Sequence, residues 1–138
     1  MKNNHSEIFT PGSIIGIMGG GQLGRMTALA AANLGYRCHI YTDEINTPAA
    51  QVSEQVTIAS YEDIEALTQF AETVDVITYE FENIPLSTAN LLSQLKVLRP
   101  SPSVLAISQH RAYEKDFAIQ NGVRVAPYIA IKGIDDLQ

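Results

Sequence analysis

Short apolar runs alternate along the 138-residue chain with segments in which apolar residues recur every three or four positions. Short runs are typical of buried strands, whereas the longer period is typical of helices with one apolar face. The runs predict strands over residues 13–18, 37–41, 56–59, 75–79, 96–98 and 128–131. The intervening segments predict helices over 22–34 and 109–121, others after Ser60, Pro85 and Ser101, and one helical turn over 49–53. This alternation favours an α/β fold with a parallel sheet flanked by helices.

Residues at helix ends and on helix faces refine these boundaries. Gly35 and Gly122 are placed to end helices, and Ser101 is placed to cap a short helix that has Pro102 at its first position. A capping box formed by Ser60 and Asp63 predicts another helix start. The helical period predicts two apolar faces: Ile64, Leu67, Phe70 and Ala71 in one helix, and Leu86, Ala89, Leu92 and Leu95 in the next.

The chain divides into three parts by pattern. Residues 1–12 are polar and lack the hydrophobic run of a signal peptide, so we expect a flexible amino-terminal arm. Residues 13–105 hold the strand–helix alternation of one domain, and the boundary is expected between Pro100 and Gln109. Residues 106–138 predict a linker helix and the first strand of a second, truncated domain. A compact domain rarely ends on an unfinished element, so we expect the chain to be a fragment.

Composition narrows the classes of partner. The hydrophobic fraction of 46% and charged fraction of 17% are typical of a soluble globular protein. A net charge of −6 without a cluster of Lys or Arg argues against nucleic acid and against an anionic membrane surface. No apolar run approaches the roughly 20 residues that cross a bilayer. The single cysteine, Cys38, lies in an apolar strand pattern and is predicted to be a buried structural thiol, which suits the cytoplasm.

The first predicted strand runs directly into a glycine-rich turn that reads GGGQLG over residues 19–24. This spacing between a strand and a helix predicts a turn whose backbone N–H groups, with the helix N-terminus, hold a phosphate or another anion. Gly19 allows the tight turn, Gly21 the approach of a ligand, and Gly24 the close packing of helix on strand. A turn that uses its glycines for packing alone is the structural alternative.

An acidic residue follows the second predicted strand. Asp43 lies about 20 residues beyond Gly24, where a carboxylate binds the ribose of NAD in dinucleotide-binding folds. Dinucleotide binding is therefore one interpretation, and a solvated loop acid is the other.

Two further carboxylates, Glu80 and Glu82, follow the fourth predicted strand. Ligands of open parallel sheets bind beyond the carboxyl ends of the strands, so both acids are expected near the glycine turn. If the strand continues, the two side chains share one face. Carboxylates repel a pyrophosphate but bind hydroxyl and amino groups. The pairing favours a phosphoribosyl compound, with its terminal phosphate on the turn, over a dinucleotide; solvated acids at a strand end are the alternative.

The segment SQHRAYEK, residues 108–115, is the third candidate. His110 and Arg111 begin a predicted helix, where a cation is unfavourable against the helix dipole, which hints at a function. An exposed charged helix face is the alternative. The three histidines have no ligand spacing, so we expect no metal site, and no nucleophile–base arrangement stands out.

Four segments, GIMGGGQLGRM, DVITYEFENI, ISQHRAYEKDF and NGVRVAPY, together resemble the 5-(carboxyamino)imidazole ribonucleotide synthases of the ATP-grasp superfamily. The resemblance spans about Ile14 to Ile131. It implies a Rossmann-like preATP-grasp domain followed by the first elements of an ATP-grasp domain. It also implies a homodimeric ligase of purine biosynthesis that uses ATP, Mg²⁺ and bicarbonate to carboxylate 5-aminoimidazole ribonucleotide.

The resemblance also implies residue roles. Gln22 and Leu23 would contact the ribonucleotide, Gly20, Gly21 and Gly24 would shape its pocket, and Arg25 is a further candidate for the phosphate. Glu80 would hold the ribose with help from Glu82, and Arg111 would reach the ATP phosphates. The family's catalytic and Mg²⁺-binding residues lie beyond Gln138, so no catalytic residue is expected here and the chain alone should not carboxylate.

Two other functions remain open at this point. One is the NAD(P)-binding Rossmann domain of a dehydrogenase, supported by the glycine turn with Asp43. The other is a stand-alone regulatory domain that senses a phosphorylated metabolite.

Overall fold

A five-stranded parallel sheet forms the centre of the computed structural model, which describes residues 8–80, 82–131 and 133–134. The strands are β1 (Ile14–Met18), β2 (Arg37–Thr42), β3 (Gln55–Ile58), β4 (Val76–Tyr79) and β5 (Val97–Leu98). Their order across the sheet is β3-β2-β1-β4-β5, so β1 pairs with both β2 and β4. The predicted α/β class is confirmed, and the predicted strand positions are correct to within about one residue for these five strands.

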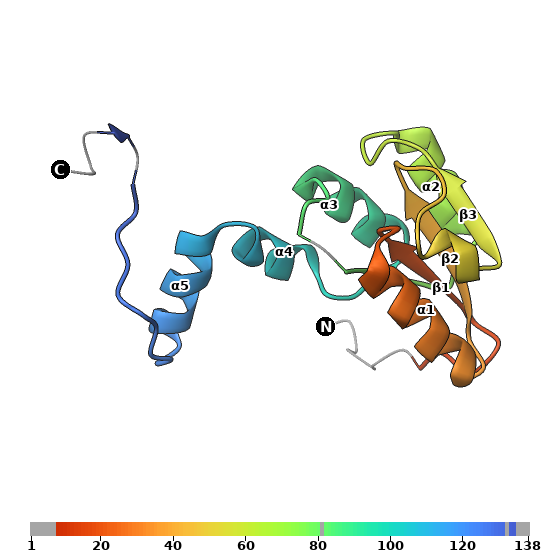
Figure 1. Ribbon diagram of the computed structural model, residues 1–138, viewed down its shortest axis with the longest axis horizontal. Helices are drawn as coiled ribbons and strands as arrows, with labels where there is room; N and C mark the ends of the chain where they lie inside the picture. The colour runs from red at the N-terminus through yellow and green to blue at the C-terminus, as the bar shows by residue number, and fades with distance from the viewer. Residues whose placement is uncertain (1–7, 81, 132, 135–138) are drawn as a thin grey trace.

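Helices cover both faces of the sheet (Figure 1). One face carries α1 (Gln22–Asn33) and the short helix η1 (Ala50–Val52), and the other carries α2 (Ile64–Glu72) and α3 (Leu86–Leu95). Alternate residues of β1 face opposite layers: Ile17 packs with Ala28 and Ala31 of α1, whereas Met18 packs with the layer of α2 and α3. Burial of both faces explains why the strands read as continuous apolar runs.

The start of α2 differs from the prediction. Asp63 is the N-cap, because its side chain accepts a hydrogen bond from the N–H of Ala66 at 3.0 Å. The Ser60 hydroxyl instead accepts from the N–H of Glu62, so the predicted capping box with Ser60 at the cap is wrong. Leu67, Phe70 and Ala71 are buried as predicted. Ile64, the first residue of the helix, is exposed.

In α3 the centre of the predicted apolar face is buried and its ends are not. Ala89 and Leu92 lie in the core, whereas Leu86 and Leu95, at the first and last positions of the helix, are partly exposed. Thr88 is buried as well, and its hydroxyl donates to the carbonyl of Tyr61. The periodicity of apolar residues cannot predict the burial of a polar residue such as Thr88.

Two helices, α4 (Pro102–Ser108) and α5 (Arg111–Gln120), lead away from the sheet (Figure 1). Pro102 occupies the first turn of α4 as predicted, but the Ser101 hydroxyl bonds the Ser103 hydroxyl and caps no backbone N–H. Leu105 of α4 is fully buried in the core, whereas α5 buries no residue. Gly122 follows α5 with a φ of +76°, as expected of a residue that ends a helix.

The strand predicted over 128–131 is wrong, since residues 123–131 have no regular secondary structure. This segment runs apart from the sheet (Figure 1), and a strand forms only where a neighbour can take its backbone hydrogen bonds. Of the predicted arm, residues 1–7 lie outside the described part of the chain. Within the described residues, no helix combines the length and apolar character needed to cross a membrane.

Candidate functional site

The turn after β1 and the segments after β2 and β4 meet at the carboxyl ends of the strands, because β1 lies between β2 and β4. They enclose a pocket of ≈ 230 Å³. It is lined by residues from five segments: Gly20 and Gly21; Thr42, Asp43 and Glu44; Thr47 and Pro48; Tyr61; and Glu80. The structure therefore brings together Gly20, Gly21, Asp43 and Glu80, all of which the sequence analysis considered.

Close packing explains why glycine occupies the turn. Gly19 has a φ of +123°, in the region that favours glycine. A Cβ on Gly20 would lie 2.5 Å from Thr47 Oγ1 and 2.7 Å from Thr42 Oγ1, and one on Gly24 would lie 2.7 Å from the carbonyl oxygen of Gly19. The carbonyl of Gly20 also accepts a hydrogen bond from the N–H of Ala49. The turn is thus packed against the loop that contains Thr47, and no side chain fits between them.

Glu80 fills the place at the start of α1 where the fingerprint predicts an anion. The N-cap, Gly21, has no capping side chain, and the Glu80 carboxylate accepts a hydrogen bond from the backbone N–H of Gly24. A Cβ on Gly21 would lie 3.2 Å from Glu80 Oε1. Burial raises the pKa of Glu80, the bond from Gly24 opposes this rise, and the nearby charge of Glu82 adds to it. A carboxylate of the chain itself therefore sits at the positive end of the helix dipole.

Acidic groups dominate the rim of the pocket. Asp43, Glu44 and Glu80 all line it, and no Lys, Arg or His of the described residues does. The pKa of Tyr61 is raised to about 12, mainly by burial and then by the charges of Asp43, Glu80 and Glu44, against a hydrogen bond with Thr42 that lowers it. Tyr61 is therefore neutral at ordinary pH. A pocket of this charge attracts hydroxyl and amino groups and repels phosphate.

Sequence reasoning missed five lining residues: Thr42, Glu44, Thr47, Pro48 and Tyr61. Thr47 is 5% exposed. Its Oγ1 is buried and has no hydrogen-bond partner among the residues that the structure describes. In the sequence, Thr47 is part of an ordinary Asn-Thr-Pro turn. This turn follows β2, which pairs with β1, and in the folded chain it packs against Gly20 at the end of β1.

Glu82 is not placed as predicted. Strand β4 ends at Tyr79, so the alternation that would put Glu80 and Glu82 on one face does not extend to them. Glu82 is exposed and lies outside the pocket lining. Its backbone carbonyl accepts a hydrogen bond from the side chain of Gln109, and so does the carbonyl of Ile84.

The remaining residues around the turn divide into two groups. Gln22 and Leu23 open α1 but do not line the pocket, and Leu23 is exposed. Arg25 donates from Nη1 to the carbonyl of Pro48 at 3.1 Å and to Gln51 Oε1 at 2.9 Å. Its guanidinium therefore ties α1 to the loop over residues 48–51.

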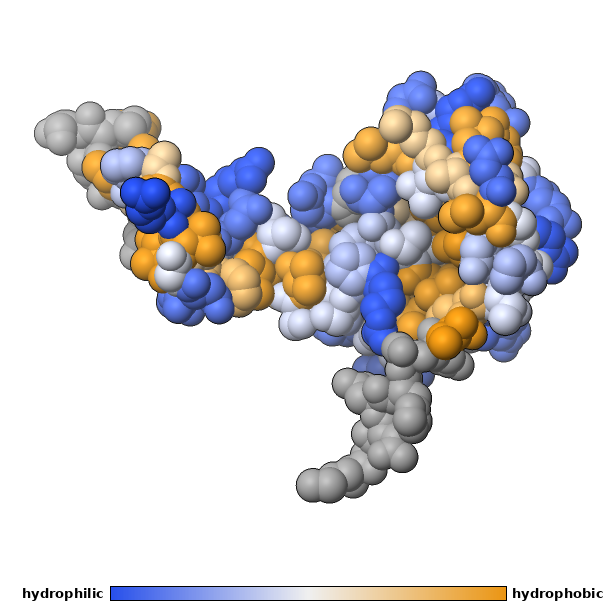
Figure 2. Space-filling model, turned by 90° about the horizontal axis from the view of Figure 1, so that it is seen from below, coloured by the Kyte–Doolittle hydropathy of each residue, from blue (hydrophilic) through white to orange (hydrophobic). Residues whose placement is uncertain are grey.

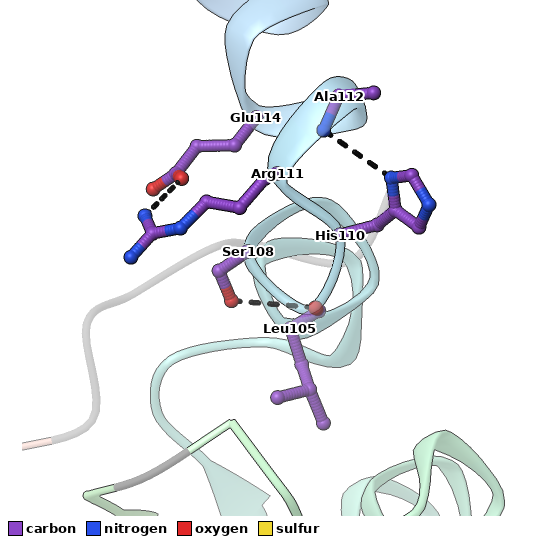
Figure 3. Close-up of polar contacts among 6 residues, drawn as sticks. All are labelled: Leu105, Ser108, His110, Arg111, Ala112 and Glu114. Atoms are coloured by element: carbon purple, nitrogen blue, oxygen red, sulfur yellow. Dashed lines mark hydrogen bonds and ion pairs between the residues drawn. The ribbon is translucent and has the colours of Figure 1, made fainter. Parts of the chain in front are cut away.

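Arg111 stands at the first position of α5, outside the pocket lining (Figure 3). Its side chain is 87% exposed and pairs with Glu114 at 2.7 Å, which is the main reason that its pKa is raised. His110, on the opposite side of the helix start in Figure 3, accepts the N–H of Ala112 through Nδ1 and stacks on Tyr113. The predicted cations therefore do begin a helix, and His110 caps it.

Metal and thiol chemistry find no support in the described part of the chain. No group of three or more His, Cys, Asp or Glu side chains there could hold a metal ion. Cys38 is buried among apolar neighbours of α1, and burial raises the pKa of its thiol, as expected of a structural cysteine. The buried His39 bonds two threonine hydroxyls and packs edge-on against Phe70.

Comparison with known proteins gives consistent matches. Residues 13–109 match the family model of the ribonucleotide synthetase preATP-grasp domain. The chain is 49% identical over 118 residues to an N5-carboxyaminoimidazole ribonucleotide synthase of Brucella melitensis, covering 86% of this chain and 33% of that protein.

Solved structures agree with this match. A Staphylococcus aureus N5-carboxyaminoimidazole synthetase in complex with ADP is 35% identical, with a TM-score of 0.87 over 94% of this chain and 35% of the other. An Aspergillus clavatus synthase, in complex with ADP and 5-aminoimidazole ribonucleotide, is 28% identical, with a TM-score of 0.76 over 85% and 31%. The chain spans about a third of the length of these relatives.

Proposed function

The chain belongs to the ribonucleotide synthetase preATP-grasp domain family, and we propose that it forms the ribonucleotide-binding wall of a 5-(carboxyamino)imidazole ribonucleotide synthase. The observation that carries the proposal is the acidic pocket between the glycine turn and Glu80. The relatives named above support the reaction, since one of them is described in complex with ADP and 5-aminoimidazole ribonucleotide. An NAD(P)-binding dehydrogenase domain is not favoured, because the family model that matches residues 13–109 is that of a ribonucleotide synthetase preATP-grasp domain.

The charge of the pocket supports a specific orientation of the ribonucleotide. Glu80 would accept hydrogen bonds from two adjacent ribose hydroxyls, and Asp43 and Glu44 would favour donors over anions at the opposite rim. The phosphate would then lie outside this rim, towards the exposed start of α1 at Gln22 and Leu23, where the first backbone N–H groups of a helix point outward. Glu82 would assist through its charge alone.

The reaction requires more groups than this chain supplies. A bicarbonate oxygen would attack the γ-phosphorus of ATP with release of ADP, and the amine of the ribonucleotide would then attack the carboxyl carbon with loss of phosphate and a proton. Arg111, exposed at the start of α5, would contact the ATP phosphates. The described residues include no group of three side chains suited to a cation, so we assign Mg²⁺ to no residue of this chain.

The division of the chain follows from the same proposal. Residues 13–105 would form the preATP-grasp domain, and residues 106–138 would be the linker helix and the start of an ATP-grasp domain. The chain alone would be inactive, the complete enzyme would be a homodimer, and the buried thiol of Cys38 supports a reducing, cytoplasmic location.

The test uses the complete enzyme, meaning this chain continued through the further two thirds present in its relatives. We expect ATP hydrolysis that depends on both 5-aminoimidazole ribonucleotide and bicarbonate. Substitution Glu80→Ala should raise the KM for the ribonucleotide more than the KM for ATP, whereas Glu72→Ala, on the exposed end of α2, should change neither. Absence of ribonucleotide-dependent turnover, or micromolar binding of NAD(H) in calorimetry, would overturn the proposal.

A further inference from the structure

Gln109 joins the end of α4 to the loop that follows β4. Its side-chain Nε2 donates to the carbonyl of Glu82 at 2.7 Å and to the carbonyl of Ile84 at 2.8 Å. A carboxamide nitrogen has two hydrogens, and both are used on one loop. The contact spans 27 and 25 residues of sequence, so it is a tertiary clamp.

Both ends of this clamp are anchored in the core. The N–H of Gln109 donates to the carbonyl of Leu105, which is fully buried, and Ile84 is fully buried in the same apolar cluster. Gln109 itself is exposed, so it binds from the surface a loop that is anchored in the core at Ile84.

The clamp lies between the two parts of the proposed site. Glu80 is two residues before Glu82, and Arg111 is two residues after Gln109. The charge of Glu82 acts on both groups, since it contributes to the raised pKa of Glu80 and to that of Arg111. A change in the loop is therefore felt at the ribose-facing carboxylate and at the cation on α5.

We propose that Gln109 is a positioning residue, which fixes the loop carrying Glu80 and Glu82 relative to Arg111 and so couples ribonucleotide binding to ATP use. The proposal rests on the proposed function of the site. Glutamine suits this role because two carbonyl oxygens need two hydrogens from a neutral donor. Glutamate would place a carboxylate against two carbonyl oxygens, and asparagine is one methylene too short to keep both bonds.

The experiment compares Gln109→Ala and Gln109→Glu in the complete enzyme, with Gln94→Ala as the matched control. Gln94 is an exposed glutamine on α3 without a hydrogen bond from its side chain among the described residues. Loss of two partly exposed hydrogen bonds should raise the KM for 5-aminoimidazole ribonucleotide about three- to tenfold, with a smaller change for ATP. The Gln109→Glu defect should lessen as the pH falls, since a protonated carboxyl donates one hydrogen.

Hydrogen exchange of backbone amides at residues 82–85 provides a second readout, which does not depend on activity. Exchange should be faster in both Gln109 variants and unchanged in Gln94→Ala. Equal changes in the two KM values, or unchanged exchange at 82–85, would overturn the role of Gln109. If the unsubstituted complete enzyme lacks ribonucleotide-dependent turnover, the proposed function fails and the exchange measurement alone decides whether the clamp exists.

Discussion

The sheet with its covering helices, residues 14–108, and the α5 region, residues 111–134, are held together in different ways. Each of the helices α1 to α4 buries at least one residue in the core, whereas α5 buries none. Large apolar side chains stay exposed in the α5 region, among them Tyr113, Phe117, Ile119, Val123, Ile129 and Ile131. Figure 2 shows this region as an arm beside the main body, with hydrophobic residues on its visible surface.

Contacts close in sequence shape the α5 region. Arg111 pairs with Glu114, the Tyr128 hydroxyl bonds Asp116, and the Lys115 ammonium lies 5.2 Å from the centre of the Tyr128 ring. Exposed pairs of this kind contribute little to stability. The two proposed parts of the site are therefore held differently: Glu80 follows a strand of the core, whereas the Arg111 side chain is held by a contact within its own helix.

The largest expected difference between the regions comes from removing an aromatic ring. Phe70 is 1% exposed and packs edge-on against His39 and Tyr41, so Phe70→Ala should lower the free energy of unfolding by about 3–5 kcal/mol. Phe117→Ala on α5 should lower it by less than about 1 kcal/mol, since that ring is 48% exposed. Urea denaturation measures both values. Similar losses in the two variants would show that α5 unfolds together with the core and contradict the difference between the regions.

A smaller effect is expected within the glycine turn. Gly20→Ala would press a methyl group against Thr47 and Thr42 and should cost about 1–3 kcal/mol of stability. Gly21→Ala meets only the end of the Glu80 side chain at 3.2 Å, so it should change stability little and weaken ribonucleotide binding instead. Thermal unfolding and calorimetry of the complete enzyme separate the two. Equal destabilisation would mean that Glu80 cannot move aside.

Acid should weaken the sheet region through His39. Burial lowers the pKa of this histidine, both of whose ring nitrogens bond threonine hydroxyls, Thr73 and Thr57. The unfolded chain then binds a proton at a higher pH than the folded chain, so stability is complete above about pH 6.5 and decreases as the pH falls below it. Unfolding measured between pH 7.5 and 5 should show this slope, and His39→Gln should reduce it. An unchanged slope would assign the acid sensitivity to other groups.

The smallest effect on stability is expected at the exposed start of α5. Arg111→Ala should leave the unfolding transition unchanged, because the side chain is exposed and pairs only with its neighbour on the helix. In the complete enzyme the same change should raise the KM for ATP, whereas Glu114→Ala, which frees the guanidinium, should not. A destabilised Arg111→Ala enzyme with normal ATP use would reverse the assigned role.

The features predictable from the sequence are those whose causes are local. The glycine turn, the helix ends at Gly35 and Gly122 and the position of Pro102 depend on backbone conformation at single residues, and all agree with the structure. The position of Glu80 beside the turn also agrees, because it follows from the rule that the carboxyl ends of parallel strands meet at one edge of the sheet.

Features with non-local causes could not be predicted. Thr47 reaches Gly20 only because a loop folds back onto the turn, and Gln109 finds its two carbonyls across more than twenty residues of sequence. The strand expected over 128–131 depends on a neighbour, which the periodicity of its own segment cannot supply. Ile64 and Leu95 follow the helical period but are exposed, at the first position of α2 and the last position of α3.

The carboxylate of Glu80 at the start of α1 affects which cellular anions can compete for this site. Inorganic phosphate and free nucleotides are abundant competitors for any open helix N-terminus. Here the chain's own acid occupies that place through the N–H of Gly24, so a bare anion must displace it against the charges of Asp43 and Glu44. A ligand that offers hydroxyl groups can instead bind the acid where it stands. The pocket thus favours ligands with hydroxyl groups over bare anions, and free phosphate should compete for the outer N–H groups at Gln22 and Leu23 and not for the pocket itself.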